Sequence, residues 1–357
     1  MPRLDGLRGM AVLLVLVQHF PAIEGAGWFN LLLSVFKKLD LGYIGVEVFF
    51  ILSGYLITRI LLNAVERRES HILPNFYIKR AVRILPIFFL TIGICLVMLP
   101  GFDYRYIAGF LGNYFFAFNP EPHPLRHFWS LAVEEQYYLV WPLMVLFLSG
   151  SRQKLGLLLI ALCVLAVLII LFRDVVVATD LSRALIHRSV ETRMLALCVG
   201  GLLAVYGVPN PNVFYLFTRG IAIVVFVMLM QQLSQAGLWP YMKSIKTFGF
   251  LGISLLLFLV AFNKTHMAGR VFEFKPLIDA GKVSYGLYVY HLPLFYYFGY
   301  SHMQVKGQVI PFDAAVMLVA VTILIALISW RYFEHPLMQY RRRFLGHRFV
   351  GESILRP

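Results

Sequence analysis

Two residues in the first apolar stretch, LRGMAVLLVLVQHF, have types and spacing that suit proton transfer beside a bound anion. Arg8 precedes the apolar run and His19 lies well inside it, eleven residues later, or roughly 16 Å along a helix at 1.5 Å per residue. Arginine binds phosphate, and histidine takes a proton near neutral pH. In a membrane span an ionisable side chain is costly, so a functional His19 is favoured over one that merely bonds a neighbouring carbonyl.

Three carboxylates are candidates to act with this histidine. Glu47 lies about one turn into the second apolar stretch, in GYIGVEVFFILSGYLI, while Glu134 and Glu135 enter a later one, in HFWSLAVEEQYYLVWPL. A carboxylate beside a histidine can orient the ring and stabilise its protonated form. We predict that Glu47 and one of the adjacent pair set the protonation of His19. The alternative for Glu47 is a side chain that reaches outward to the membrane surface.

A pair of arginines provides a second candidate site. Arg80 and Arg83 lie three residues apart, on one side of a helix, in YIKRAVRILP. Paired arginines suit a polyphosphate, although they could equally contact lipid headgroups. The sequence has no Walker loop and no glycine-rich dinucleotide fingerprint, so any nucleotide must be held by side chains.

A polar stripe follows near the C-terminal end of the chain. Ser284, Tyr288 and His291 stand at i, i+4 and i+7 in SYGLYVYHLPL, which places them on one helix face. We predict that they line a tunnel or stabilise an oxyanion. Further on, Arg331 and Glu334 are predicted to form a structural ion pair. The three cysteines stand apart in apolar runs without clustered histidines, and no metal site is predicted.

Membrane-spanning helices are the elements that must position these residues. Of 357 residues, 60% are hydrophobic and 14% are charged, and the mean hydropathy is +0.75. That balance excludes a soluble domain. The net charge of +14 is explained by basic cytoplasmic loops, so we expect contact with membrane lipid and no nucleic-acid partner.

The predicted fold is all-α, a polytopic membrane bundle of about ten transmembrane helices with both termini cytoplasmic, since the basic segments fall on that side. We expect one transmembrane domain over 1–340, a basic cytoplasmic tail over 341–357, and a multi-pass protein of the inner or plasma membrane.

The aromatic stretch 104–118 is too short to cross comfortably and is predicted to be interfacial or re-entrant, although an eleventh span is possible. The ten apolar windows are about 9–23, 44–62, 84–100, 131–148, 155–172, 194–208, 219–235, 245–262, 283–300 and 311–332.

These placements predict a path for an acyl thioester. The phosphate-binding arginines gather at the cytoplasmic end, and the acid–base groups lie roughly 16 Å or more deeper. The pantetheine arm of coenzyme A has a similar reach. The alternative is a proton-coupled transporter of a sugar or small metabolite, because intramembrane histidine and glutamate also suit a proton relay. A non-catalytic scaffold would leave the buried charges unexplained.

Five motifs, in order across nearly the whole chain, resemble the acyltransferase-3 family of integral-membrane O-acyltransferases. The resemblance implies transfer of an acyl group, usually acetyl, from cytosolic acyl-coenzyme A to a hydroxyl of an extracytoplasmic glycan, a lipid-linked sugar or a secreted metabolite. Acyl-coenzyme A is then a co-substrate, with no permanently bound cofactor. The motifs are RLDGLRGMAVLLVLVQHF, GYIGVEVFFILSGYLI, KRAVRILP, FWSLAVEEQYYLVWP, and SYGLYVYHLPL with FEHP.

The same resemblance implies roles for individual residues. Arg8 and His19 are expected to be essential, the histidine as a general base or as a transient acyl carrier, with Arg80 and Arg83 near the donor. The family commonly has aspartate where Glu47 stands, so the carboxylate moves by about a methylene. Some relatives carry a C-terminal esterase-like domain, and the short stretch after the last window predicts a stand-alone chain without one.

Overall fold

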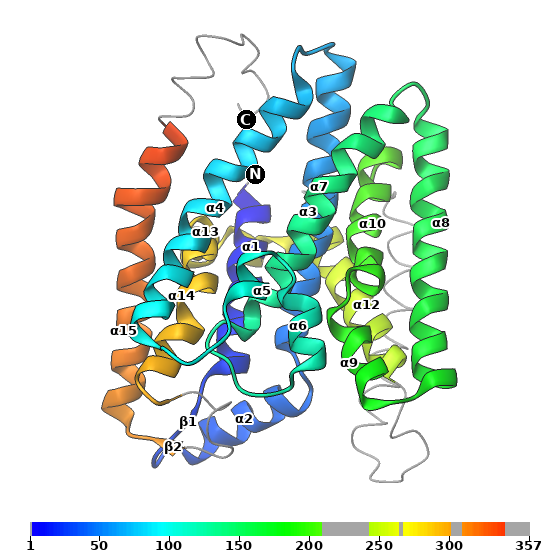
Figure 1. Ribbon diagram of the computed structural model, residues 1–357. Coiled ribbons are helices and arrows are strands. Elements are labelled where there is room, and N and C mark those ends of the chain that lie inside the picture. Colours follow the sequence, from blue (N-terminus) through cyan, green and yellow to red (C-terminus); the bar gives the residue numbers. More distant parts are fainter. Residues whose placement is uncertain (1, 209–242, 264–266, 301–308, 340–357) are drawn as a thin grey trace.

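A computed structural model describes residues 2–208, 243–263, 267–300 and 309–339. Within them the chain is almost wholly helical, and its long helices stand roughly side by side (Figure 1). The strands are one parallel pair of two residues each, β1 (Ala22–Ile23) and β2 (Val309–Ile310). The prediction of an all-α class is confirmed.

The long helices follow the predicted apolar windows. The window at about 219–235 and the tail 341–357 lie outside the described residues. The long helices are α1 (Pro2–His19), α3 (Gly42–Glu66), α4 (Ile72–Met98), α7 (Trp129–Phe147), α8 (Arg152–Leu171), α10 (Val190–Tyr206), α12 (Lys243–Phe262), α14 (Ser284–Tyr297) and α15 (Phe312–Ser329). The shorter ones are α2 (Gly27–Lys38), α5 (Arg105–Ala108), α6 (Gly112–Phe118), η1 (Arg126–Phe128), η2 (Phe172–Val177), α9 (Asp180–Arg188), η3 (Met267–Glu273), α13 (Lys275–Lys282) and η4 (Trp330–Glu334).

Among the described residues, 5 helical stretches are long and apolar enough to cross a membrane, or up to 6 if the bent α12–η3 pair forms one span. α14 has only 14 residues, fewer than the roughly 20 that a span needs. The total of about ten spans and the cytoplasmic termini stay predictions. The 5 stretches are Gly42–Glu66, Ile72–Met98, Arg152–Val177, Asp180–Tyr206 and Phe312–Gln339.

The aromatic stretch 104–118 folds into two short helices, α5 with 4 residues and α6 with 7. Neither is long enough to cross a bilayer. The expectation of a segment too short to span is therefore confirmed, and the possible eleventh span is not formed here.

Close helix packing fixes the position of α1 within the bundle. Gly45 of α3 lies so near α1 that a Cβ there would meet the Ala11 carbonyl oxygen at 2.3 Å. On its other side, a Cβ on Gly281 of α13 would come within 1.8 Å of the Asp5 carbonyl oxygen. Only glycine fits at either contact, since real Cβ atoms need more than 3 Å. The first turn and the middle of α1 are thus held rigidly against α13 and α3, respectively.

Candidate functional site

A cavity of about 510 Å³ lies among α1, α3, α4, α7 and α14, a size typical of small-molecule sites. Its wall carries more positive than negative side chains, and a low-dielectric cleft concentrates such a field. The cavity therefore favours an anionic ligand. The charged lining consists of four arginines, Arg8, Arg59, Arg80 and Arg83, and two carboxylates, Asp5 and Glu134.

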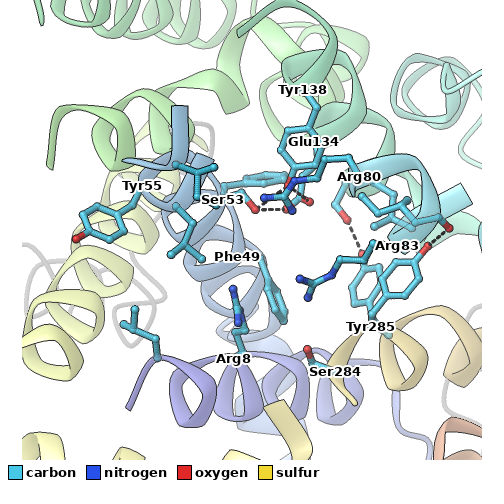
Figure 2. A pocket seen from close by; sticks show the side chains of 18 of the residues that line it. Arg8, Phe49, Ser53, Tyr55, Arg80, Arg83, Glu134, Tyr138, Ser284 and Tyr285 are labelled. Atoms are coloured by element: carbon cyan, nitrogen blue, oxygen red, sulfur yellow. Dashed lines mark hydrogen bonds between the residues drawn. The ribbon is translucent and has the colours of Figure 1, made fainter. Parts of the chain in front are cut away.

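The three arginines predicted from the sequence lie together in this cavity. Figure 2 shows the guanidinium groups of Arg8, from α1, and Arg83, from α4, pointing into the same space. Arg8 Nη1 donates to the Asp5 carboxylate at 3.1 Å. The Arg80 guanidinium lies over the Tyr138 ring, 5.2 Å from its centroid. A guanidinium stacked in this way still presents its N–H edge to an anion.

Glu134 belongs to the arginine cavity rather than to the histidine. Its carboxylate accepts hydrogen bonds from the Ser53 hydroxyl at 3.1 Å and from the Tyr138 hydroxyl at 2.7 Å. Glu135 lines neither of the two cavities described here, and its Oε1 is buried without a hydrogen-bond partner. The structure thus corrects the prediction that one of these two glutamates sets the protonation of His19.

A smaller cavity of about 80 Å³ lies at the other end of α1. Because α1 is unbroken and eleven residues make about three turns, Arg8 and His19 share one helix face. Arg8 lines the larger cavity and His19 lines the smaller one. Val46 and Tyr288 line both cavities and form their common wall. The smaller cavity is lined by Val15, Gln18, His19, Gly42, Tyr43, Val46, Arg126, His127, Trp129, Arg188 and Tyr288.

The partner of His19 is His291, which comes from α14. Nδ1 of His19 lies 3.1 Å from Nε2 of His291, whose Nδ1 lies 2.7 Å from the Tyr288 carbonyl oxygen. A carbonyl only accepts, so the hydrogen-bond network assigns the proton of neutral His291 to Nδ1 and makes its Nε2 an acceptor. Neutral His19 then donates from Nδ1 and carries its lone pair on Nε2, which is the form that a general base needs.

A third histidine, which was not predicted from the sequence, completes the cluster. His127 precedes α7, and its ring centroid lies 4.8 Å from that of His291. Its Nε2 lies 3.3 Å from the Val289 carbonyl oxygen, while its Nδ1 is buried without a hydrogen-bond partner. The residue stands directly before the FWSLAVEE motif. This position beside the motif could have identified His127 as a candidate site residue from the sequence. Trp129, the first residue of α7, is buried beside this cavity.

The predicted polar stripe on α14 extends from one cavity to the other. Ser284 lines the larger cavity and donates to the Gly281 carbonyl at 2.8 Å. Tyr288 stands in the common wall, where its hydroxyl donates to the His127 carbonyl at 2.7 Å and lies 2.6 Å from the Ser130 hydroxyl. His291, with 0% of its surface exposed, ends the stripe beside His19.

Glu47 has a different partner from the one we predicted. Its carboxylate forms an ion pair with Arg193 of α10, and both residues are 2% exposed. Arg193 also donates to the His187 and Ile186 carbonyls at 3.0 and 3.1 Å. A buried carboxylate needs such a counter-charge, so Glu47 ties α3 to α10 instead of orienting His19 or reaching the membrane surface. Arg193 directly precedes the apolar window at about 194–208.

The predicted pair of Arg331 and Glu334 is not formed. Glu334 accepts from the Ser329 hydroxyl at 3.0 Å, whereas the Arg331 guanidinium lies 5.9 Å from the Tyr332 ring centroid. The π-helical turn η4 explains the difference, because its wider spacing moves residues three apart off a common face.

Comparisons with known proteins agree with the motif pattern. A family model described as an acyltransferase domain matches residues 1–331. The peptidoglycan O-acetyltransferase OatA of Listeria monocytogenes is 29% identical over 94% of this chain and 55% of that protein. The O-acetyltransferase OatA of Staphylococcus aureus is 28% identical over 94% and 57%, and the putative peptidoglycan O-acetyltransferase YrhL of Bacillus subtilis is 28% identical over 97% and 57%.

The extent of these matches decides what they establish. The chain spans about half the length of the curated relatives it matches. No solved structure matches it. Because the family model takes in 331 of the 357 residues, the chain belongs to the acyltransferase-domain family.

Proposed function

We propose that the protein is a membrane O-acyltransferase that moves an acetyl group from cytosolic acetyl-coenzyme A to a hydroxyl of an extracytoplasmic carbohydrate. Membership of the acyltransferase family and the names of the relatives support this reaction class. The observation that carries the mechanism is the common wall. Val46 and Tyr288 line both the arginine cavity and the His19 cavity, so a donor held in one can present its acyl group to a base in the other.

The arginine cavity is the proposed donor site. Arg8, Arg80 and Arg83 bind the phosphate groups of coenzyme A, because guanidinium groups pair with phosphate oxygens in a bidentate manner. The basic segment YIKRAVRILP identifies this end as the cytoplasmic one under the positive-inside rule. Acetyl-coenzyme A binds here as a co-substrate for each turnover.

His19 is the proposed general base. Its Nε2 takes the proton of the acceptor hydroxyl while the hydroxyl oxygen attacks the thioester carbonyl carbon. The tetrahedral intermediate then collapses, the C–S bond breaks, and the protonated His19 returns the proton to the coenzyme A thiolate. His291 accepts the Nδ1–H bond of His19 and holds the ring. The hydroxyls of Tyr288 and Ser130 both lie in the wall of the donor cavity. The Tyr288 hydroxyl donates to the His127 carbonyl at 2.7 Å, and in the proposed mechanism it turns this proton to the oxyanion as the intermediate forms.

A transporter explains less of this arrangement. A proton relay would use His19 and the buried carboxylates, but it needs neither a cavity with four arginines nor the acyltransferase family pattern. The two functions differ in what the purified protein does with acetyl-coenzyme A.

The test uses purified protein in lipid nanodiscs with acetyl-coenzyme A radiolabelled in the acetyl group. De-O-acetylated peptidoglycan strands serve as the probe acceptor. We expect alkali-labile label on the glycan with the wild-type protein and at least a hundredfold less with His19→Gln. Equal labelling by His19→Gln, at equal protein and with an unchanged melting temperature, would contradict the role of His19. Proton-driven sugar uptake into proteoliposomes without any acetyl transfer would support the transporter.

A further inference from the structure

Two arginines in the His19 cavity have no part in the transfer described above. Arg126 of η1 and Arg188 of α9 both line this cavity. In the part of the chain that the structure describes, neither guanidinium forms an ion pair with a carboxylate. The nearby Arg193, by contrast, is neutralised by Glu47. The wall beside the proposed base therefore carries two positive charges that no carboxylate pairs with directly.

Backbone contacts hold both guanidinium groups in place without neutralising them. Arg126 Nη1 donates to the Pro120 and Glu121 carbonyls at 2.6 and 2.7 Å. Arg188 Nη1 donates to the Phe116 carbonyl at 2.8 Å, while its Nε is buried with no hydrogen-bond partner. A guanidinium has five N–H donors, so each group is oriented by one nitrogen and keeps others for a ligand.

The two charges also lie close enough to repel each other. Burial and the neighbouring Arg188 lower the pKa of Arg126, which lies outside the spanning segments, to about 10. Arg126 thus remains protonated at neutral pH. Partly buried like charges without counter-charge are costly, whereas a pair of guanidinium groups matches the oxygens of a carboxylate or phosphate.

We propose that Arg126 and Arg188 bind an anionic group of the acceptor, a carboxylate or a phosphate, and thereby place its hydroxyl at His19. This inference rests on the proposed acyl transfer and specifies its acceptor as an acidic sugar or a sugar phosphate. The cavity of about 80 Å³ compares with roughly 30 Å³ for one water, so it has room for the anion and the reacting hydroxyl but not for a whole sugar.

The experiment compares three glycans of equal length as acceptors for nanodisc-bound protein. One is a neutral N-acetylglucosamine oligomer, the second carries a free lactyl carboxylate, and the third carries a 1-phosphate. KM and kcat for transfer of labelled acetyl are measured with each. We expect the carboxylate or the phosphate glycan to have a KM at least tenfold below that of the neutral glycan. The better of the two identifies which anion the acceptor bears.

Variants assign that preference to the arginines. Arg126→Gln and Arg188→Gln should each raise KM for the anionic glycan about tenfold, leaving kcat for the neutral glycan and KM for acetyl-coenzyme A unchanged. Arg188→Lys keeps the charge and should keep part of the preference. Arg105→Gln is the matched control, because Arg105 has a side chain that is 86% exposed and lines neither cavity. The melting temperature of each variant without glycan checks its folding.

The outcomes separate this inference from the proposed function. Equal KM values for the three glycans, or arginine variants that weaken all three equally, overturn the anion site while leaving acyl transfer intact. The melting temperature with each glycan and without acetyl-coenzyme A reports binding alone. A rise specific to an anionic glycan and absent in Arg188→Gln supports the site even if no acetyl is transferred, in which case the proposed function fails. No glycan-specific rise and no transfer would overturn both.

Discussion

Nδ1 of His19 lies 3.1 Å from Nε2 of His291, which joins two residues that are 272 positions apart in the sequence. His291 is in turn anchored to the carbonyl of Tyr288 at 2.7 Å. A neutral histidine thus occupies the position that a carboxylate holds in a Ser-His-Asp triad: it fixes the tautomer and direction of the base. The pairing makes His291 a positioning residue rather than a group that contacts the substrate.

His291→Leu should therefore lower kcat by about a hundredfold, within the range that general base catalysis contributes, without changing KM for acetyl-coenzyme A. His291→Gln should retain more activity, because the glutamine Oε1 can still accept from His19. The pH profile of kcat/KM should shift in both variants, as the basicity of His19 depends on its acceptor. His335→Gln, on an exposed histidine directly after η4, is the control. Equal loss in the Leu and Gln variants would contradict a positioning role.

The donor site predicts a selective loss of acetyl-coenzyme A affinity. Arg8→Gln, Arg80→Gln and Arg83→Gln should each raise the Kd for acetyl-coenzyme A about 10- to 100-fold, since a hydrogen bond to a charged group contributes about 1.5–3 kcal/mol. Isothermal titration with nanodisc-bound protein measures this. Lys79→Gln is the matched control, because Lys79 precedes Arg80 in sequence but is exposed and does not line the cavity.

A truncated donor separates phosphate binding from a general effect on folding. S-acetylpantetheine lacks the phosphates of coenzyme A, so its KM should be high with the wild-type protein and unchanged in the three arginine variants. If the variants weakened both donors to the same degree, the arginines would not be phosphate ligands.

The common wall predicts that Tyr288 acts on the chemical step. Its hydroxyl pairs with that of Ser130 at 2.6 Å, and removal of an oxyanion donor costs about 10²- to 10³-fold in kcat. Tyr288→Phe should lower kcat by that amount and leave the Kd for acetyl-coenzyme A unchanged. Tyr290→Phe is the neighbouring control, because Tyr290 lines neither cavity and its hydroxyl lies 3.0 Å from that of Ser329. Similar kcat values for the two variants would remove Tyr288 from the reaction.

The buried pair of Glu47 and Arg193 predicts an effect on stability. Glu47→Gln leaves Arg193 buried without its counter-charge, at a cost of about 3–5 kcal/mol, so the melting temperature in detergent should fall markedly. Glu47→Leu combined with Arg193→Met should recover part of that loss, because neither charge remains buried. Glu66→Gln, which removes an exposed partner of Arg152, should change little. A melting temperature of Glu47→Gln equal to that of the wild-type protein would show that the pair is not structural.

The sequence was a good guide to the helices and to which residues face inward. Apolar length located the windows that became α3, α4 and α15, and helical spacing placed His19 roughly 16 Å along the first helix from Arg8. The sequence was a poor guide to which side chains pair with each other, because a contact between helices that are distant in the sequence leaves no local pattern. Glu47 was matched with His19 by depth, whereas packing brings Arg193 of α10 against it. Both histidines of the central pair were candidates, but only the fold brings α14 to the end of α1.

The central claim, that a donor at the Arg8 cavity is used at the His19 cavity on the opposite side, is tested most directly by sealed proteoliposomes of uniform orientation. Labelled acetyl-coenzyme A is supplied only on the side exposing YIKRAVRILP, and de-O-acetylated peptidoglycan strands only on the other. Alkali-labile label should appear on the glycan across the bilayer and be lost with His19→Gln. Label that appears only when donor and glycan share one side would contradict the claim.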